Sequence, residues 1–225
     1  MDSQGSVFNH MKHHEIIETK ILSRTSLGED SFLVTLEKKT HFTPGQVLGV
    51  TGDLKDPLRY YSICSSSLAA EWEILFKLVP EGKVTNFLAR SPVGSTVYVS
   101  HPQGTFIQRP GPGIWIAGGT GVAPFLSMVR TGIRHPLIQG GRTLESLYFH
   151  EYFQEKLGKD YHPCCSTQAA PGVPKIRLMD FLKTLEWKTE ENHYLCGSAT
   201  MVVEVRDLLI SRGVPYEQIY SEIYF

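Results

Sequence analysis

The chain has 225 residues, of which 41% are hydrophobic and 20% are charged, a composition typical of a globular protein with one large or two small domains. Lys and Arg number 22 against 23 Asp and Glu, and the formal net charge of −1 argues against nucleic-acid binding, which usually needs a basic excess. No apolar run approaches the ~18 residues of a membrane span, and the N-terminus lacks the apolar stretch of a secretory signal.

The cysteines and histidines lack metal-binding spacing. Four cysteines occur without a CxxC pair or a Cys/His zinc pattern, so we expect free thiols, a reducing cytoplasmic compartment and no bound metal. The neighbouring Cys164 and Cys165 could be redox-active, although two free thiols near a strand are the simpler interpretation. Residues 1–14, which include three histidines, are expected to form a flexible tail.

The first half of the sequence alternates short apolar runs with turn residues. The runs are rich in Val, Ile, Phe and Tyr, and Pro, Gly and Asp separate them, which predicts an antiparallel barrel or sandwich. A short helix is expected at Thr85–Ala89, with Thr85 as its N-cap. We assign residues 15–107 to this β domain. The predicted strands are Ile16–Ser23, Ser31–Leu36, Gln46–Thr51, Tyr60–Ser65, Trp72–Val79 and Thr96–Ser100.

The second half alternates strands with helices. Residues 108–113, QRPGPG, form a stiff turn-rich segment that we take as the linker to a domain at residues 114–225. The alternation predicts a parallel sheet covered by helices on both faces. The predicted strands are Ile114–Ala117, Ser146–Phe149, Tyr161–Cys165, Tyr194–Cys196 and Ile219–Ile223, and the predicted helices are Ala123–Arg130, Tyr152–Leu157, Leu178–Leu185 and Met201–Arg212.

A glycine-rich turn follows the first strand of the second half. The sequence Gly118-Gly119-Thr120-Gly121-Val122-Ala123-Pro124 opens a helix, where backbone N–H groups and the helix dipole favour a pyrophosphate. The order differs from GxGxxG, and a glycine turn into a helix, taken alone, is often only a tight connection.

Residues in the β domain offer further ligand groups. In Arg59-Tyr60-Tyr61-Ser62, an Arg can pair with a phosphate, an aromatic ring can stack on a planar group and a hydroxyl can bind a ring nitrogen. Side-chain alternation places Arg59 and Tyr61 on one face of the strand. A strand edge with an ordinary exposed arginine would have the same sequence pattern. Gly82-Lys83-Val84-Thr85 offers free amides and a hydroxyl as a second anion site.

Two segments of the α/β half could also meet a ligand. Tyr194-Leu195-Cys196-Gly197-Ser198 ends a strand at the sheet edge where ligands bind in parallel sheets, although a Cys there is often core packing. Glu222-Ile223-Tyr224-Phe225 ends the sequence with two aromatic residues, which either fill a core or stack on a ligand.

These signals in this order resemble the ferredoxin–NADP reductase superfamily of flavoproteins. The motifs are RYYS (59–62), GKVTNFL (82–88), HPQGTF (101–106), GGTGVAP (118–124), YLCG (194–197) and EIYF (222–225). The resemblance implies two domains, an N-terminal antiparallel Greek-key β-barrel for the flavin and a C-terminal α/β doubly wound parallel sheet for the nicotinamide nucleotide.

The resemblance also implies roles for individual residues around the flavin. Arg59 is expected to contact the flavin pyrophosphate, Tyr60 and Tyr61 to lie at the ring, and Ser62 to bind its redox-active nitrogen. Gly82, Lys83, Val84 and Thr85 are expected to hold the flavin phosphates. FAD is favoured over FMN because two phosphate contacts are available. Tyr224, with Phe225 beyond it, is expected to cover the other ring face, and Glu222 to assist proton or electron transfer.

On the nucleotide side, the resemblance assigns the pyrophosphate to Gly119, Thr120, Gly121 and Pro124, and the nicotinamide to Cys196 and Gly197. NADP-specific members carry a Ser–Arg pair after the third strand, where this chain has Ser166–Thr167. The loop predicted after the second strand is acidic at Glu151, so NADH is favoured over NADPH. Lys175 or Arg177 could reach a phosphate and reverse that preference.

The function implied by the resemblance is hydride transfer from NAD(P)H to bound FAD, and then electron transfer to a separate acceptor such as a ferredoxin, flavodoxin or haem protein. The acceptor is expected on another chain because these residues contain no iron–sulfur cysteine cluster. Two alternatives remain at this stage. One is a free-flavin reductase, and the other is a nucleotide-binding electron-transfer or regulatory subunit of a larger complex.

Overall fold

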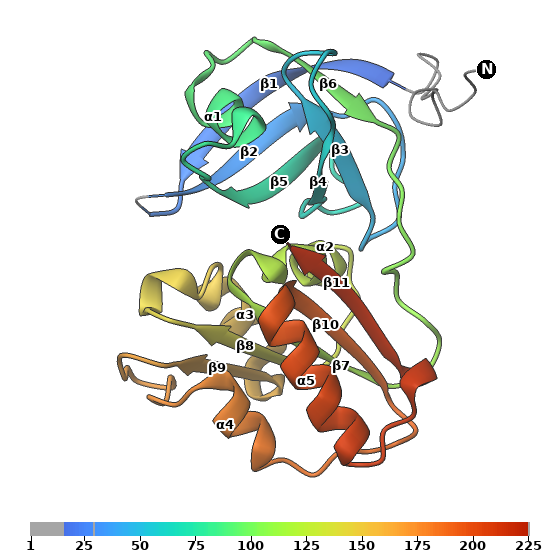
Figure 1. The fold of residues 1–225 in the computed structure, drawn as a ribbon, viewed down its shortest axis with the longest axis vertical. Coiled ribbons are helices and arrows are strands. Elements are labelled where there is room, and N and C mark those ends of the chain that lie inside the picture. The colour runs from blue at the N-terminus through green and yellow to red at the C-terminus, as the bar shows by residue number, and fades with distance from the viewer. Residues whose placement is uncertain (1–15, 29, 225) are drawn as a thin grey trace, which may run out of the picture.

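The computed structural model describes residues 16–28 and 30–224, which fold into a β-barrel and an α/β unit stacked one above the other (Figure 1). The expected tail at residues 1–14 and the role expected for Phe225 fall outside the described residues. Strand β11 ends beside the barrel, so the end of the described chain lies between the two units (Figure 1). No helix in the described ranges is long and apolar enough to cross a membrane.

Within the described ranges, six strands build the barrel, in the order β4-β3-β6-β1-β2-β5. All five pairings are antiparallel, and a bridge between Ile63 and Ile74 brings the two edges nearly together. A long connection places β6 between β1 and β3, as Greek-key topology requires. The fold class predicted for this half is confirmed. The strands are β1 (Ile16–Ser26), β2 (Ser31–Glu37), β3 (Val47–Thr51), β4 (Arg59–Ser62), β5 (Glu71–Lys77) and β6 (Thr96–Ser100).

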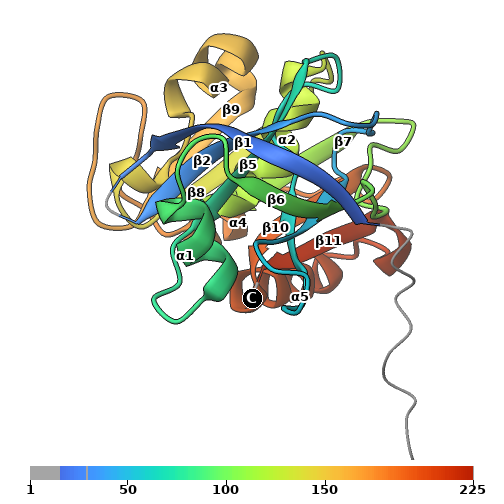
Figure 2. The same ribbon diagram turned by 90° about the horizontal axis from the view of Figure 1, so that it is seen from above.

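The barrel interior is filled by alternating side chains of these strands. Val34 and Leu36 of β2, and Trp72 and Ile74 of β5, have no exposed surface, and each such side chain contributes ~2–3 kcal/mol of hydrophobic stabilisation. Helix α1 (Lys83–Arg90) closes one end of the barrel, as seen from above in Figure 2. The barrel therefore presents β4 and the start of α1 from a rigid core.

Five parallel strands within the described ranges form the second sheet, in the order β11-β10-β7-β8-β9. Helices α2 and α3 pack on one face with Trp115 and Tyr194, and α4 and α5 pack on the other with Ile116 and Leu195. Both faces are covered, so the doubly wound prediction is confirmed. The strands are β7 (Gly113–Gly118), β8 (Leu137–Gly141), β9 (Tyr161–Cys165), β10 (Asn192–Ser198) and β11 (Ile219–Tyr224). The helices are α2 (Ala123–Arg130), α3 (His150–Leu157), α4 (Leu178–Lys183) and α5 (Ala199–Ser211), with short 3-10 turns η2 (Gly119–Val122), η3 (Leu144–Ser146), η4 (Gly158–Asp160) and η5 (Tyr216–Gln218).

The second parallel strand is not where the sequence predicted it. The strand expected at Ser146–Phe149 is wrong, because strand β8 occupies Leu137–Gly141 and residues 144–146 form a 3-10 turn. No element was predicted at residues 137–141, which include Gln139 and two glycines. In the structure the Gln139 side chain is buried and hydrogen-bonded to Tyr161 at 2.6 Å. A Cβ at Gly140 would lie 2.8 Å from Leu178, so that glycine admits close helix packing instead of a bend.

Candidate functional site

The glycine-rich turn lies where the order of the parallel strands reverses. Strand β7 is flanked by β10 on one side and by β8 on the other, and ligands of open α/β sheets bind at the carboxyl edge of such a reversal. Gly119, Thr120 and Gly121 form η2 directly after β7, and α2 begins two residues later. Pro124 is buried in the first turn of α2, so it supports this turn from the core side.

Gly119 and Gly121 of this turn are required for different steric reasons. Gly119 has φ +55°, and a Cβ there would meet no heavy atom within 4 Å, so its backbone faces open space. A Cβ at Gly121 would lie 2.2 Å from the Cys196 carbonyl oxygen and 2.6 Å from the Gly197 nitrogen. The turn is therefore pressed against the end of β10, and only glycine permits this contact.

Side chains from both units converge at one polar cluster. Ser62 ends β4 of the barrel, while Cys196 and Glu222 are opposite each other on the parallel strands β10 and β11. The Ser62 hydroxyl donates to the Glu222 carboxylate, and the Tyr224 hydroxyl donates to Ser62 Oγ at 2.6 Å. The Tyr224 hydroxyl also contacts the Cys196 thiol. All four residues predicted to be catalytic are brought together.

Ser62 and Cys196 are buried and Glu222 and Tyr224 are partly buried, and this reduced access of water affects the protonation of the cluster. Burial raises the pKa of Cys196 and of Tyr224 well above their ordinary values, and the nearby Glu222 carboxylate adds to both shifts. Burial also raises the pKa of Glu222, although the hydroxyls of Ser62 and Tyr224 oppose that rise. The thiol and the phenol thus keep their protons at neutral pH. A hydrogen-bonded chain of this kind can hold a proton at a defined place.

Strand β4 presents the remaining predicted flavin residues along the barrel edge. Arg59 and Tyr60 are exposed, and Tyr61 is half-buried, with its ring centroid 5.9 Å from that of Phe76 in an edge-to-face arrangement. Burial raises the pKa of Tyr61 to about 12, while the charge of Arg59 acts against that rise, so the two side chains share one side of the strand. Tyr60 lies against Gly49, where a Cβ would come within 2.9 Å of its ring.

The first turn of α1 forms the second predicted anion site. Gly82 is the N-cap, so the N–H groups of the first turn have no partner inside the helix. Lys83 adds a cation, and its ammonium pairs with Asp56 at 2.6 Å. Val84 is buried beneath the turn. The Thr85 hydroxyl instead turns back to the loop, where it accepts from the Val79 N–H at 3.2 Å, so the predicted anion would meet the backbone N–H groups and not this hydroxyl.

The predicted acidic loop after the second parallel strand is wrong. Glu151 lies in the first turn of α3, because β8 ends much earlier, at Gly141. The residue that follows β8 is the exposed Arg142, which the sequence reasoning missed. The signal was present, because Pro136 and two apolar residues precede the glycines as they would a buried strand.

Ser166 and Thr167 follow β9 and lie beside this arginine. Their hydroxyls donate to the Arg142 carbonyl oxygen at 3.4 Å and 2.6 Å. The backbone of Lys175 forms a β-bridge with Cys165 at the end of β9. Arg177 is the N-cap residue of α4, a helix that packs on β8 and β9. The carboxyl edge of these two strands therefore carries three exposed cations, Arg142, Lys175 and Arg177.

The donor groups at the site fit two phosphate-bearing cofactors. The open turn at Gly119, at the start of the segment that leads into α2, suits one pyrophosphate, and Arg59 with the first turn of α1 suits another. The Tyr224 ring of the α/β unit lies next to the Ser62 hydroxyl, and Tyr61, the preceding residue of β4, offers a second aromatic ring on the barrel. This combination defines an oxidoreductase module that binds two nucleotides across the junction of a barrel and a doubly wound sheet.

Comparison with known proteins agrees with that class. Residues 17–107 match the oxidoreductase FAD-binding domain, and residues 115–207 match the oxidoreductase NAD-binding domain. A ferredoxin NADP+ reductase from Neisseria gonorrhoeae with bound FAD and NADP superposes with a TM-score of 0.84 at 21% identity, covering 94% of this chain and 99% of that one. The chain belongs to the ferredoxin–NADP reductase superfamily of flavoprotein oxidoreductases.

Two relatives indicate the setting in which such modules occur. The ferredoxin–NAD(P)+ reductase component of the naphthalene 1,2-dioxygenase/salicylate 5-hydroxylase systems of Ralstonia sp is 30% identical over 213 residues, which covers 85% of this chain and 63% of the relative. The anthranilate 1,2-dioxygenase electron transfer component of Acinetobacter baylyi is 28% identical over 227 residues, which covers 92% of this chain and 66% of the relative. The chain thus spans slightly less than two thirds of the length of these relatives.

Proposed function

We propose that the protein transfers a hydride from NAD(P)H to bound FAD and passes the electrons to a separate acceptor protein such as a ferredoxin, a flavodoxin or a haem protein. The observation that carries this proposal is the hydrogen-bonded cluster of Ser62, Cys196, Glu222 and Tyr224, to which both domains contribute. The relatives named above, a ferredoxin reductase component and an electron transfer component, support an acceptor on another chain.

The residues of the chain would hold and orient the two cofactors. Arg59 and the first turn of α1 bind the flavin phosphates, and the turn at Gly119 and Gly121 binds the nucleotide pyrophosphate. Bound FAD would supply the redox chemistry, because a flavin can accept a hydride, which carries two electrons, and release the electrons one at a time. Ser62 and Glu222 would hold a proton at the cluster that faces the cofactors, and the buried Cys196 would help to exclude water from it.

For the electron donor, we infer that Arg142 decides between the two nicotinamide nucleotides. NADH was favoured by an acidic residue expected after the second strand, and a basic residue stands there instead. Arg142 beside Thr167 brings a positive charge to the position expected for the ribose phosphate, which favours NADPH. A charge-assisted hydrogen bond contributes ~1.5–3 kcal/mol, equivalent to ~10–100-fold in specificity.

Steady-state kinetics test this inference. We expect Arg142→Ala to lower the ratio of kcat/KM for NADPH to that for NADH by at least ~10-fold. Glu151→Gln is the matched control and should leave the ratio unchanged, because this side chain is exposed on α3. An unchanged ratio in Arg142→Ala would contradict the role of the arginine. An altered ratio in Glu151→Gln would show that Glu151 contributes to the preference between NADH and NADPH.

The function itself is tested by an anaerobic titration of the purified protein with each nucleotide. A yellow protein whose visible flavin absorbance bleaches on addition of nucleotide supports the reductase. Bleaching that occurs only with freely exchanging flavin, and not with flavin retained through gel filtration, would favour a free-flavin reductase. A protein that stays colourless after incubation with FAD would refute the proposal and favour a nucleotide-binding subunit.

A further inference from the structure

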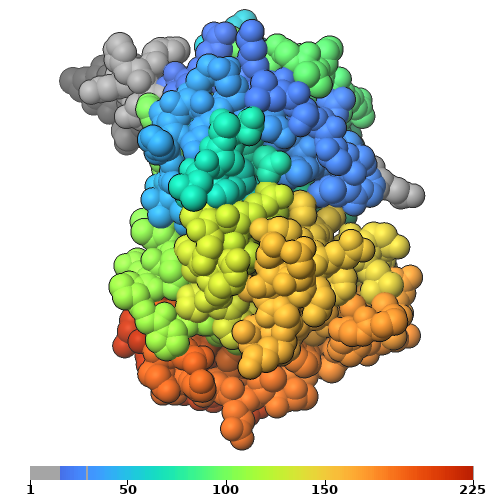
Figure 3. Space-filling view, turned by 180° about the vertical axis from the view of Figure 1, so that it is seen from behind, coloured from blue at the N-terminus to red at the C-terminus, as the bar shows by residue number. Residues whose placement is uncertain are grey.

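Helix α2 connects the candidate nucleotide site with the barrel. Its N-terminus follows the glycine-rich turn, and its last residue, Arg130, lies at the boundary between the two units. Eight residues make a helix ~12 Å long, which is short and buried along almost its whole length. Figure 3 shows α2 and α3, in yellow-green and gold, directly against the barrel. A displacement at one end of this helix is therefore transmitted to the other.

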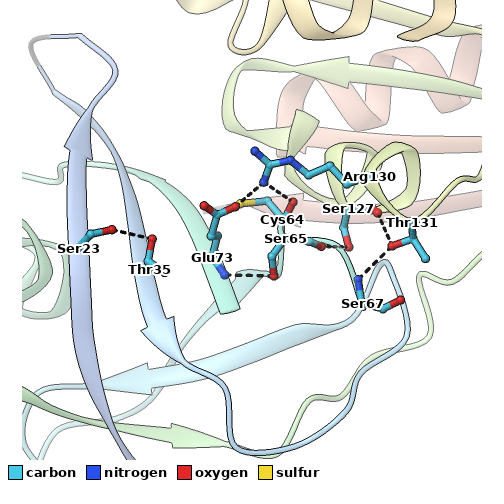
Figure 4. A network of polar contacts seen from close by, with 9 residues as sticks. All are labelled: Ser23, Thr35, Cys64, Ser65, Ser67, Glu73, Ser127, Arg130 and Thr131. Carbon is cyan, nitrogen blue, oxygen red and sulfur yellow. Dashed lines mark hydrogen bonds and ion pairs between the residues drawn. The ribbon is translucent and has the colours of Figure 1, made fainter. Parts of the chain in front are cut away.

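The C-terminal end of α2 binds the barrel through several polar contacts, drawn in Figure 4. The Arg130 guanidinium donates to the Cys64 carbonyl oxygen at 3.0 Å and to the Glu73 carboxylate. The fully buried Ser127 hydroxyl donates to the Ser65 carbonyl oxygen at 2.7 Å, and Thr131 Oγ1 accepts from the Ser67 N–H at 3.0 Å. We call Arg130, Glu73, Ser127, Thr131 and the backbone of residues 64–67 the domain clasp.

The clasp holds the segment that continues the candidate flavin strand. Cys64 is two residues beyond Ser62, and its N–H donates to the Glu73 carbonyl oxygen at 2.8 Å, which ties this segment to β5. The clasp therefore fixes α2 against the same stretch of chain that carries Tyr61 and Ser62. Most of these hydrogen bonds are made to main-chain atoms of residues 64–67, which cannot rotate away as side chains can. They therefore fix where α2 sits on this segment.

Arg130 is itself held in place by two aromatic rings. Its guanidinium carbon lies 5.5 Å from the ring centroid of Phe149 and 5.8 Å from that of Tyr152. Phe149 has φ +60°, the left-handed region, and within residues 16–28 and 30–224 it is the only residue other than glycine with a positive φ. The neighbouring Tyr148 hydroxyl contacts the Ser31 hydroxyl of β2 at 2.6 Å. An unfavourable backbone conformation is thus retained where it supports the clasp.

We propose that Arg130 is a positioning residue, which sets the orientation of the nucleotide domain relative to β4 and so the alignment of the two cofactors for hydride transfer. This inference rests on the proposed function. Hydride transfer needs the donor and acceptor rings at near-attack distance, and an error of ~1 Å from a remote substitution can cost ~100-fold in rate. When Arg130 changes, α2 and the glycine-rich turn would move together as one rigid segment and the turn would keep its own geometry, so we expect nucleotide binding to be kept while the rate of hydride transfer falls.

Stopped-flow reduction tests the proposal. The limiting rate of flavin bleaching and the apparent dissociation constant of the nucleotide are measured for the wild type, Arg130→Ala, Arg130→Lys and Glu73→Gln. We expect Arg130→Ala to slow the limiting rate at least ~10-fold with the dissociation constant within ~3-fold, and Arg130→Lys to restore part of the rate. Arg206→Ala removes an exposed ion pair with Asp207 and serves as the control, with no expected change in rate.

A second readout needs no cofactor turnover. Small-angle X-ray scattering of the protein without nucleotide should give a larger radius of gyration for Arg130→Ala than for the wild type and for Arg206→Ala. Should Arg130→Ala fail to fold, Glu73→Gln carries both measurements. A wild-type limiting rate together with wild-type scattering in these variants would overturn the proposal. Absence of bleaching in the wild type would refute the proposed function instead, and scattering would still decide whether the clasp holds the domains.

Discussion

A single methyl group added at Gly121 should damage the protein far more than one added two residues earlier. In Gly121→Ala the new Cβ would lie 2.2 Å from the Cys196 carbonyl oxygen and 2.6 Å from the Gly197 nitrogen. Both are main-chain atoms of β10, so no side chain can rotate away. Ordinary contact requires ~3.5 Å, and the glycine-rich turn and the end of β10 would have to separate by about 1 Å.

The expected cost follows from this displacement. Overpacking a buried contact costs ~1–3 kcal/mol, and a main-chain clash belongs at the upper end of that range. For a protein of this size, 1 kcal/mol lowers the unfolding midpoint by ~2–4 °C, so Gly121→Ala should unfold ~6–12 °C below the wild type. The same separation moves the N–H groups of the turn, and we expect weaker binding of the nicotinamide nucleotide.

Gly119→Ala provides the matched comparison for stability. The φ of +55° makes an alanine there strained, but a Cβ would meet no heavy atom within 4 Å. The strain alone costs ~1 kcal/mol, or ~2–4 °C in the unfolding midpoint. Thermal unfolding followed by circular dichroism measures both variants. A Gly121→Ala midpoint equal to that of the wild type, or a Gly119→Ala loss as large as that of Gly121→Ala, would refute the steric argument.

Two further variants test the site. Burial raises the pKa of Glu222, so the native protein binds this proton more tightly than the unfolded chain does, and the charged carboxylate lowers stability as the pH rises through its native pKa. Glu222→Gln should therefore unfold at a higher temperature than the wild type at pH 8, with the difference disappearing by about pH 4; equal pH profiles would contradict this. Thr85→Val removes the hydroxyl that holds the Val79 N–H at 3.2 Å, which should cost about 1 kcal/mol and speed the loss of FAD on dialysis; unchanged FAD retention would show that the loop does not depend on this bond.

Most segments of the candidate site could be located from the sequence because each segment is local. The glycine-rich turn follows an apolar strand and opens a helix, and η2 and α2 have the predicted places. Helix α2 and strands β6 and β9 have the predicted bounds, since short apolar runs with clear turn residues at both ends specify them. The prediction of the second parallel strand, which is β8 in the structure, was wrong because its residues are determined by a contact that is not local. Its Gly140 permits a close approach of Leu178, a residue distant in sequence, and a local pattern does not contain that contact.

The meeting of residues distant in sequence came from tertiary packing. The Ser62–Glu222 contact joins positions 160 residues apart, and Arg130 reaches Glu73 across the domain boundary. Arg142 follows β8 at the place where an acidic residue was expected, so the part of the predicted NADH preference that rested on that loop depended on where the second strand ends. Local sequence patterns were enough to predict an antiparallel β half and a doubly wound α/β half, because periodicity and turn residues act over a few positions, whereas the choice of a barrel over a sandwich came from the family resemblance. The convergence of the chemical groups at the site is a property of the packed domains, because it depends on the relative placement of two separate cores.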